Sequence, residues 1–180
     1  MDFLARENLV VVGVKAREPI IGQMLWMLEE TRGRTLAAVA GLESDILEWE
    51  PPYGGNSIAS LLYHIPAIEA DWLYVEVLQA ESFHKELIPY FPVDVTEPDG
   101  RLARWRGESL QAMRARLRSV RLELLDAFTT MSWQDYTDPR SLPEYDVTPE
   151  WVLYHLLQHE NEHLGEIGVV KQLALAALRP

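Results

Sequence analysis

Apolar residues recur at helical spacing in four long stretches of the chain. In each stretch they return every three or four positions, which places them on one face of a helix. The stretches cover residues 19–41, 57–80, 102–128 and 149–180. No stretch shows the sustained alternation that is typical of a strand. The pattern predicts an all-α chain whose four helices must bury their apolar faces against one another.

Segments rich in proline and glycine separate these stretches. Residues 49–55 read W-E-P-P-Y-G-G and end one element before Asn56 or Ser57 caps the next. Residues 81–100 lack helical periodicity and are long enough for a crossover or a lid, and residues 131–147 form the last predicted loop. We therefore expect a four-helix bundle with a long connection between helices 2 and 3. It forms a single domain over residues 1–180, with residues 1–18 as an N-terminal arm.

The fourth predicted helix carries most of the candidate chemistry. Thr148 and Pro149 suit its first turn, and His155, His159 and His163 then recur every four residues. His159 and His163 point toward the apolar side, where an unpaired ring nitrogen costs about 1–3 kcal/mol. Two histidines at positions i and i+4 commonly hold a metal ion, which removes that cost. The alternative is a pair of core histidines bonded to carbonyls or carboxylates. This alternative is the one we expect for His155, which lies about 60° from the direction of the pair.

One further histidine lies on the second predicted helix. His64 is about 90° from the centre of the apolar stripe, which by itself indicates a surface or boundary residue. Pro66 follows two residues later and predicts a kink, because proline removes one helical hydrogen bond. The kink either re-aims the histidine or only curves the helix around the core.

Arginine is concentrated near the third predicted helix. The stretch holds seven of the chain's 16 basic residues, namely Arg101, Arg104, Arg106, Arg114, Arg116, Arg118 and Arg121. Such a cluster could bind a carboxylate-bearing ligand or the acidic surface of a partner. The alternative is a solvated helix face that is paired with acids elsewhere.

Composition narrows the possible functions. With 48% hydrophobic and 24% charged residues, the chain has the values of a folded globular protein. A net charge of -12 argues against a nucleic-acid partner. Because the sequence contains no cysteine, any metal must be held by His, Asp or Glu. The acidic first residues do not resemble a signal peptide, and no apolar run is long enough to cross a membrane. We expect no membrane association and a cytoplasmic location.

Several of these residues occur in an order that resembles a known family. The order is Asn56-Ser57-Ile58, His64, Glu69 and Trp72, then Thr148-Pro149-Glu150, His159, His163, Gly165 and Ile167. It is similar to the DinB-like (YfiT-type) damage-inducible family. The resemblance implies a four-helix bundle, often a homodimer, with zinc or nickel bound by one histidine of helix 2 and two of helix 4. These positions are His64, His159 and His163. The family usually continues His-Arg-Gly-Gln, whereas this chain has Leu164 and Glu166 in place of arginine and glutamine.

Three chemistries are compatible with such a site. Three histidine ligands leave a fourth position open on zinc, which is typical of catalytic sites. The resemblance implies a transferase or isomerase that uses a low-molecular-weight thiol and acts on a small-molecule substrate. The stretch 159–163 also fits the zinc-protease pattern H-E-x-x-H, and Glu160 would then be the general base of a small-molecule hydrolase; otherwise it is a solvated acid. Alternatively, a fourth ligand from His155, Glu166 or Asp71 would make the site structural, in a non-enzymatic metal- or ligand-binding module.

Overall fold

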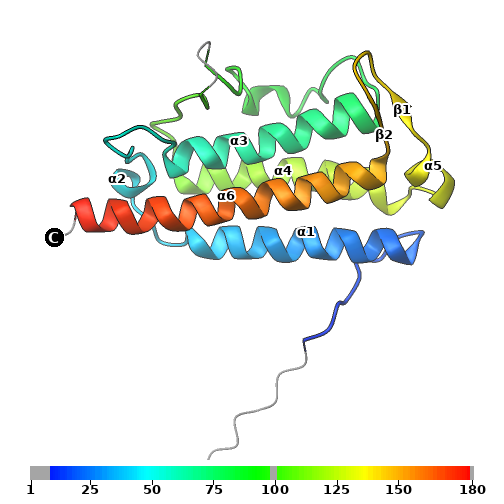
Figure 1. Cartoon of the computed structure of the whole chain (residues 1–180), viewed down its shortest axis with the longest axis horizontal. Coiled ribbons are helices and arrows are strands. Elements are labelled where there is room, and N and C mark those ends of the chain that lie inside the picture. Colours follow the sequence, from blue (N-terminus) through cyan, green and yellow to red (C-terminus); the bar gives the residue numbers. More distant parts are fainter. Residues whose placement is uncertain (1–8, 98–100, 179–180) are drawn as a thin grey trace, which may run out of the picture.

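The computed structural model of the chain describes residues 9–97 and 101–178, and four long helices lie side by side in it (Figure 1). They are α1 (Pro19–Ala38), α3 (Ile58–Asp71), α4 (Leu110–Thr129) and α6 (Pro149–Leu178). Helix α6 packs against α1 and α3, and α4 packs against the same two helices. The predicted all-α four-helix bundle is therefore confirmed. The expectations for residues 1–8 lie outside the described residues.

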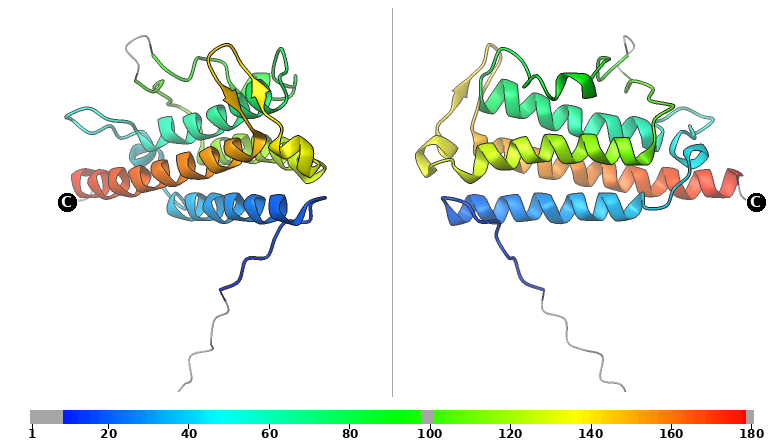
Figure 2. Two further views of the ribbon diagram at one scale, coloured as in Figure 1. Left: turned by 45° about the vertical axis from the view of Figure 1, so that its right-hand side comes forward. Right: turned by 180° about the vertical axis from the view of Figure 1, so that it is seen from behind.

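A long return connection separates α3 from α4. The two helices run in the same direction, so the chain must travel back along the bundle between them (Figures 1 and 2). Residues 78–109 make this return, with a short 3-10 turn at Ile88–Tyr90; residues 98–100 lie outside the description. Trp105 N–H donates a hydrogen bond to Ser60 Oγ at 3.1 Å, which fixes the end of the connection to α3. The predicted long link between helices 2 and 3 is confirmed.

The predicted start of the third helix near residue 102 was wrong. The helix begins at Leu110, where the Ser109 side chain caps it by accepting from the Ala112 N–H. Gly107, just before the cap, has a φ of 74°, a left-handed conformation that interrupts a helix. The apolar residues 102 and 105 belong instead to the return connection.

Short elements lie between the predicted long helices. Helix α2 (Ser44–Leu47) follows α1, and α5 (Trp133–Thr137) follows α4. Strands β1 (Arg140–Ser141) and β2 (Asp146–Val147) then form an antiparallel pair that leads into α6. Elements of two to five residues are too short to show a hydrophobic period, which is why the sequence pattern missed them.

The N-terminal caps of α3 and α6 are those that the sequence predicts. Ser57 Oγ accepts from the Ser60 N–H at the start of α3, and Thr148 Oγ1 accepts from the Trp151 N–H at the start of α6. Helix α3 continues without interruption through Pro66. Its irregular part comes later, as π-helical turns at Trp72–Val77.

A charged layer divides the apolar core into two clusters. One cluster lies near α5 and includes Ile21, Leu25, Leu28, Leu73, Leu124, Phe128, Val152 and Leu156. The other lies near α2 and includes Ile46, Ile58, Leu61, Leu62, Ile65, Met113, Leu117, Ile167 and Val170. Between them each long helix contributes one buried charged residue, namely Arg32, Glu69, Arg121 and Glu160. Along the chain, His64 lies a few residues before Glu69 on α3, and His159 and His163 flank Glu160 on α6.

The described residues before α1 form an extended arm. Val14 N–H donates to the Gly22 carbonyl oxygen at 2.9 Å, so the arm crosses the first turns of α1. Residues 9–12 are exposed and lead away from the bundle (Figure 1). No helix in the described part of the chain is long and apolar enough to span a membrane.

Candidate metal centre

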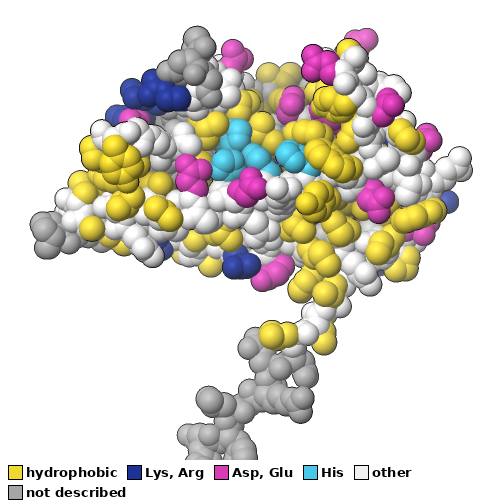
Figure 3. Space-filling view, viewed as in Figure 1, with side chains coloured by type: hydrophobic (Ala, Val, Ile, Leu, Met, Phe, Trp, Pro, Cys, Tyr) yellow, Lys and Arg dark blue, Asp and Glu magenta, His cyan; other side chains and the backbone are white. Residues whose placement is uncertain are grey.

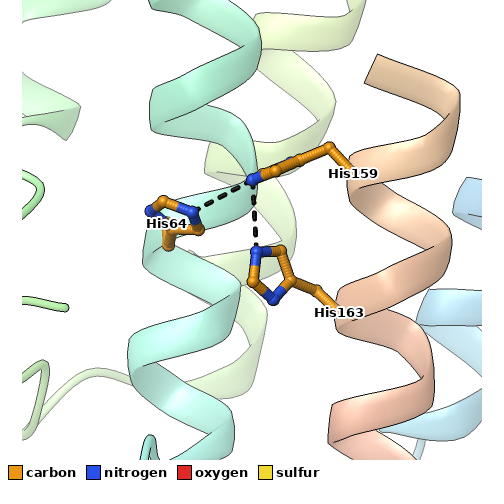
Figure 4. A group of neighbouring side chains, drawn as sticks. All are labelled: His64, His159 and His163. Carbon is orange, nitrogen blue, oxygen red and sulfur yellow. Dashed lines mark hydrogen bonds between the residues drawn. The ribbon is translucent and has the colours of Figure 1, made fainter. Parts of the chain in front are cut away.

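Three histidine side chains from two helices converge on one point (Figure 4). His64 comes from α3, and His159 and His163 come from α6. The Nε2 atom of His159 lies 3.0 Å from that of His64 and 3.2 Å from that of His163. Ligand nitrogens bound to a tetrahedral zinc ion at about 2.0–2.1 Å are about 3.3 Å apart. These two distances are therefore close to the ligand spacing around a zinc ion, and the ligand atoms of all three histidines lie within 4.8 Å of one another.

Burial keeps two of the three rings neutral, those of His64 and His159. Burial, followed by the nearby His163, lowers the pKa of His64 to about 4. The pKa of His159 falls to about 3 because the ring is buried and lies beside His163 and His64. Neutral imidazole is the form that binds metals, so no proton has to leave these two rings at neutral pH.

His64 is more buried than its position on the helix stripe indicated. It is only 9% exposed, because α3 packs directly against α6 at this level, so the expectation of a surface or boundary residue was wrong. Its Nδ1 atom has no hydrogen-bond partner in the described structure. The other ring nitrogen faces the two histidines of α6.

Glu166 orients one ligand from outside the cluster. Its Oε2 accepts a hydrogen bond from His163 Nδ1 at 3.1 Å, and its Oε1 accepts from Asn56 Nδ2 at 2.9 Å. The bond from His163 lowers the pKa of the Glu166 carboxyl group and holds it as a carboxylate. Because His163 carries its proton on Nδ1, its Nε2 is free to bind a metal. Glu166 was expected as a possible fourth ligand and as a departure from the family's glutamine; its spacing of three residues from His163 was the available sign of this supporting role.

The remaining candidate ligands do not join the cluster. Among the described residues, the group whose ligand atoms all lie within 4.8 Å of one another contains only His64, His159 and His163. The His155 ring centroid is 6.0 Å from that of His159, and His155 stacks on Trp151 instead. The site therefore offers three protein ligands.

The cluster is accessible from one face of the molecule. His159 and His163 are partly exposed. Figure 3 shows histidine side chains at the surface of this face, with hydrophobic side chains beside them. A small molecule can therefore reach the point on which the histidines converge.

Glu160 belongs to the charged layer of the core. It is 1% exposed, so the expectation of a solvated acid was wrong. Its Oε1 accepts from Arg32 Nε at 2.7 Å, and its Oε2 accepts from Arg121 Nη2 at 3.0 Å. With both oxygens held by buried arginines, the position of Glu160 gives no support to a general-base role.

Two arginines of the basic cluster are structural. Arg121 joins the charged layer, and the guanidinium group of Arg116 lies 5.0 Å from the Tyr63 ring centroid and 4.9 Å from that of Trp105. Both are less than 5% exposed, so the expected solvated face was wrong for them. Arg104 and Arg106 pair with Glu50 at the surface.

A comparison with known protein families identifies the family of this chain. The profile of the DinB superfamily matches residues 27–167, which include all three histidines of the cluster. A comparison with curated protein sequences gave no match. The matched segment covers well over half of the chain and reaches from α1 into α6. The chain therefore belongs to the DinB superfamily.

Proposed function

We propose that this protein is a divalent-metal-dependent enzyme that holds zinc or nickel on His64, His159 and His163. The observation that carries the proposal is the convergence of three Nε2 atoms on an accessible face. Such a metal, when bound, supplies a Lewis acid that lowers the pKa of a coordinated water or thiol. The chain itself contributes the three histidine side chains and Glu166, which fixes the orientation of His163.

The number of ligands favours catalysis over a purely structural role. A structural zinc site is closed by four protein ligands, whereas a catalytic one keeps a position for substrate. In the described part of the chain, the cluster contains three candidate ligands and no fourth. The hydrolase alternative has lost its proposed base, because both oxygens of Glu160 are held by arginines.

We propose thiol transfer or isomerisation as the reaction, on the strength of the family resemblance. Because the chain has no cysteine, the thiol must come from a separate low-molecular-weight cofactor. In the transfer, the thiol loses its proton to solvent and its sulfur bonds to an electrophilic carbon of the substrate. The leaving group departs with the electron pair of the broken bond.

Metal content is the first test of this proposal. Elemental mass spectrometry of untagged wild type is expected to give about one equivalent of zinc or nickel. His64→Ala and His159→Ala should each lose it while circular dichroism shows an intact helical fold. His84→Ala is the matched control, because His84 is exposed and pairs with Glu86 away from the site. Wild type that binds no metal, even after zinc or nickel is added, would contradict the proposal.

Replacing the supporting carboxylate gives a graded version of this test. Glu166→Gln keeps the size of the side chain but weakens the acceptor for His163 Nδ1, so metal affinity should fall by about 10- to 100-fold. Glu162→Gln is the control on the same helix, since Glu162 is exposed and bonds only Gln158 in the described structure.

The reaction is tested separately. Metal-loaded wild type is assayed with a panel of low-molecular-weight thiols and a chromogenic electrophile. If the metal binds but no thiol reacts, the thiol-transfer part of the proposal fails.

A further inference from the structure

An aromatic pocket lies at the start of α6, beside the histidine cluster. It has a volume of about 450 Å³ and is lined by Trp72, Tyr145, Asp146, Val147, Thr148 and Trp151. The Trp72 ring centroid lies 5.3 Å from that of Trp151 and 6.4 Å from that of Tyr145. Tyr145 and Trp151 are 44% and 45% exposed, so their rings are available to a ligand.

His155 joins this pocket to the three histidines. Its ring stacks on Trp151 with centroids 5.0 Å apart and an interplanar angle of 9°. The His155 centroid also lies 4.4 Å from that of Trp72 and 6.0 Å from that of His159. A continuous surface of aromatic rings therefore runs from the pocket to the candidate metal centre.

A buried carboxylate stands behind the pocket. Tyr145 O–H donates a hydrogen bond to Glu76 Oε1 at 2.8 Å. Glu76 is 5% exposed, and its other oxygen, Oε2, has no hydrogen-bond partner in the described structure. Burial raises the pKa of Glu76, and the negative charge of Asp71 adds to this effect.

Neither of these carboxylates has a basic partner. Within residues 9–97 and 101–178, no lysine or arginine forms an ion pair with Glu76 or Asp71. Arg140 on the neighbouring strand β1 donates instead to the Val77 carbonyl oxygen and pairs with Asp135. The pocket therefore combines electron-rich rings with two nearby carboxyl groups that no lysine or arginine of the described residues pairs with.

We propose that the aromatic pocket binds an organic ammonium group, preferably a quaternary one, of the substrate. Cations are attracted to the faces of Trp and Tyr rings within about 6 Å of the centroid. The hydrogen bond from Tyr145 to Glu76 makes the tyrosine ring more electron-rich, and the two carboxylates add a favourable field. The ammonium group is held in the pocket while the remainder of the molecule extends past His155 toward the histidine cluster. This assignment of the ligand as substrate rests on the proposed function, but the binding itself does not require the metal.

A pair of ligands with one shape and different charge tests the proposal. Choline and its neutral isostere 3,3-dimethyl-1-butanol are titrated into chelator-treated full-length protein at constant ionic strength, with tryptophan indole N–H signals followed by NMR. Choline should bind saturably and at least about tenfold more tightly than the alcohol. Equal affinities would show an ordinary apolar pocket and overturn the proposal, as would the absence of choline binding.

Variants locate the binding and separate this proposal from the metal site. Glu76→Gln should weaken choline binding at least about fivefold and leave the alcohol unaffected, because only the charge changes. Trp151→Leu should abolish choline binding, whereas Trp133→Leu, which removes a similarly exposed ring on α5, should not. Unchanged choline binding in both Glu76→Gln and Trp151→Leu would overturn the proposal. Metal content is measured on each preparation before the chelator is added, so the two proposals can fail independently.

Discussion

At the scale of single residues, the charged layer is the most consequential feature of the core. Glu69 accepts from Arg32 Nη2 at 2.6 Å and from Arg121 Nε at 2.7 Å, and Glu160 bonds the same two arginines. Transferring these charges out of water is costly, so the layer adds little net stability compared with an apolar layer. Removing one member is different, because it leaves a buried charge without its partner. The layer therefore favours the alignment of the bundle in which the four charged residues, one from each long helix, lie at the same height along the bundle.

The substitution Glu69→Gln tests this coupling. We expect a loss of about 3–5 kcal/mol in the free energy of unfolding, because Arg32 and Arg121 would lose a buried counter-charge. Glu29→Gln is the control: Glu29 pairs with Arg121 but is 41% exposed, and its loss should cost at most about 1 kcal/mol. Both values come from urea denaturation followed by circular dichroism. Equal losses in the two variants would contradict a special role for the buried layer.

The same residue predicts how this stability depends on pH. The positive charges of Arg121 and Arg32 outweigh the effect of burial and hold the pKa of Glu69 below its usual 4.5. A lowered pKa in the folded state means that the stabilisation is present above pH 4.5 and is lost as the pH falls through the folded-state value. The difference in unfolding free energy between wild type and Glu69→Gln should therefore shrink below pH 4.5. A constant difference down to the lowest pH at which the protein still folds would contradict this account.

The sequence could identify residues whose role depends on near neighbours, but not the members of the charged layer. The caps at Ser57 and Thr148 and the pairing of His159 with His163 follow from spacings of three or four residues. Arg32 and Glu160 meet across 128 residues, and no local pattern records that distance. For the same reason His64 could be joined to the site only through the family resemblance.

At the scale of elements, the period of the hydrophobic residues predicted the long helices better than the segments that connect them. The period located all four, because each buries a continuous stripe over several turns. It overestimated the third helix, since Leu102 and Trp105 belong to the return connection, which packs them against the core cluster near α2. The aromatic pocket also depends on elements without a period, the strand pair at Arg140–Val147 and the π-helical turns after α3.

The contact between the N-terminal arm and α1 gives a prediction at this scale. A Cβ atom added at Gly22 would overlap the Val14 carbonyl oxygen, whereas one added at Gly33 would meet no atom within 4 Å. Gly33→Ala should therefore stabilise the protein by about 0.5–1 kcal/mol through helix propensity alone. Gly22→Ala should lack this gain and should lose hydrogen-exchange protection at the Val14 amide. A gain as large as that of Gly33→Ala, with protection retained, would show that the arm does not cross α1 in this way.

At the scale of the whole molecule, the candidate metal centre joins two helices that are already held together by other contacts. Two apolar clusters and the charged layer support the bundle without using the histidines. The fold should therefore survive without the metal. A structural zinc module behaves in the opposite way, because its folding depends on the ion.

Removing the metal distinguishes these two cases. Chelation of the loaded protein should leave its helical circular dichroism unchanged at 25 °C. A metal present at a thousandfold excess over its Kd stabilises the folded state by about 4 kcal/mol, and chelation should lower Tm by about 8–16 °C for a chain of this size. His64→Ala should show no such shift, because it lacks one of the three ligands from the start. If chelation instead removed most of the helical signal, the ion would be holding the bundle together, and the site would have to be reinterpreted as structural.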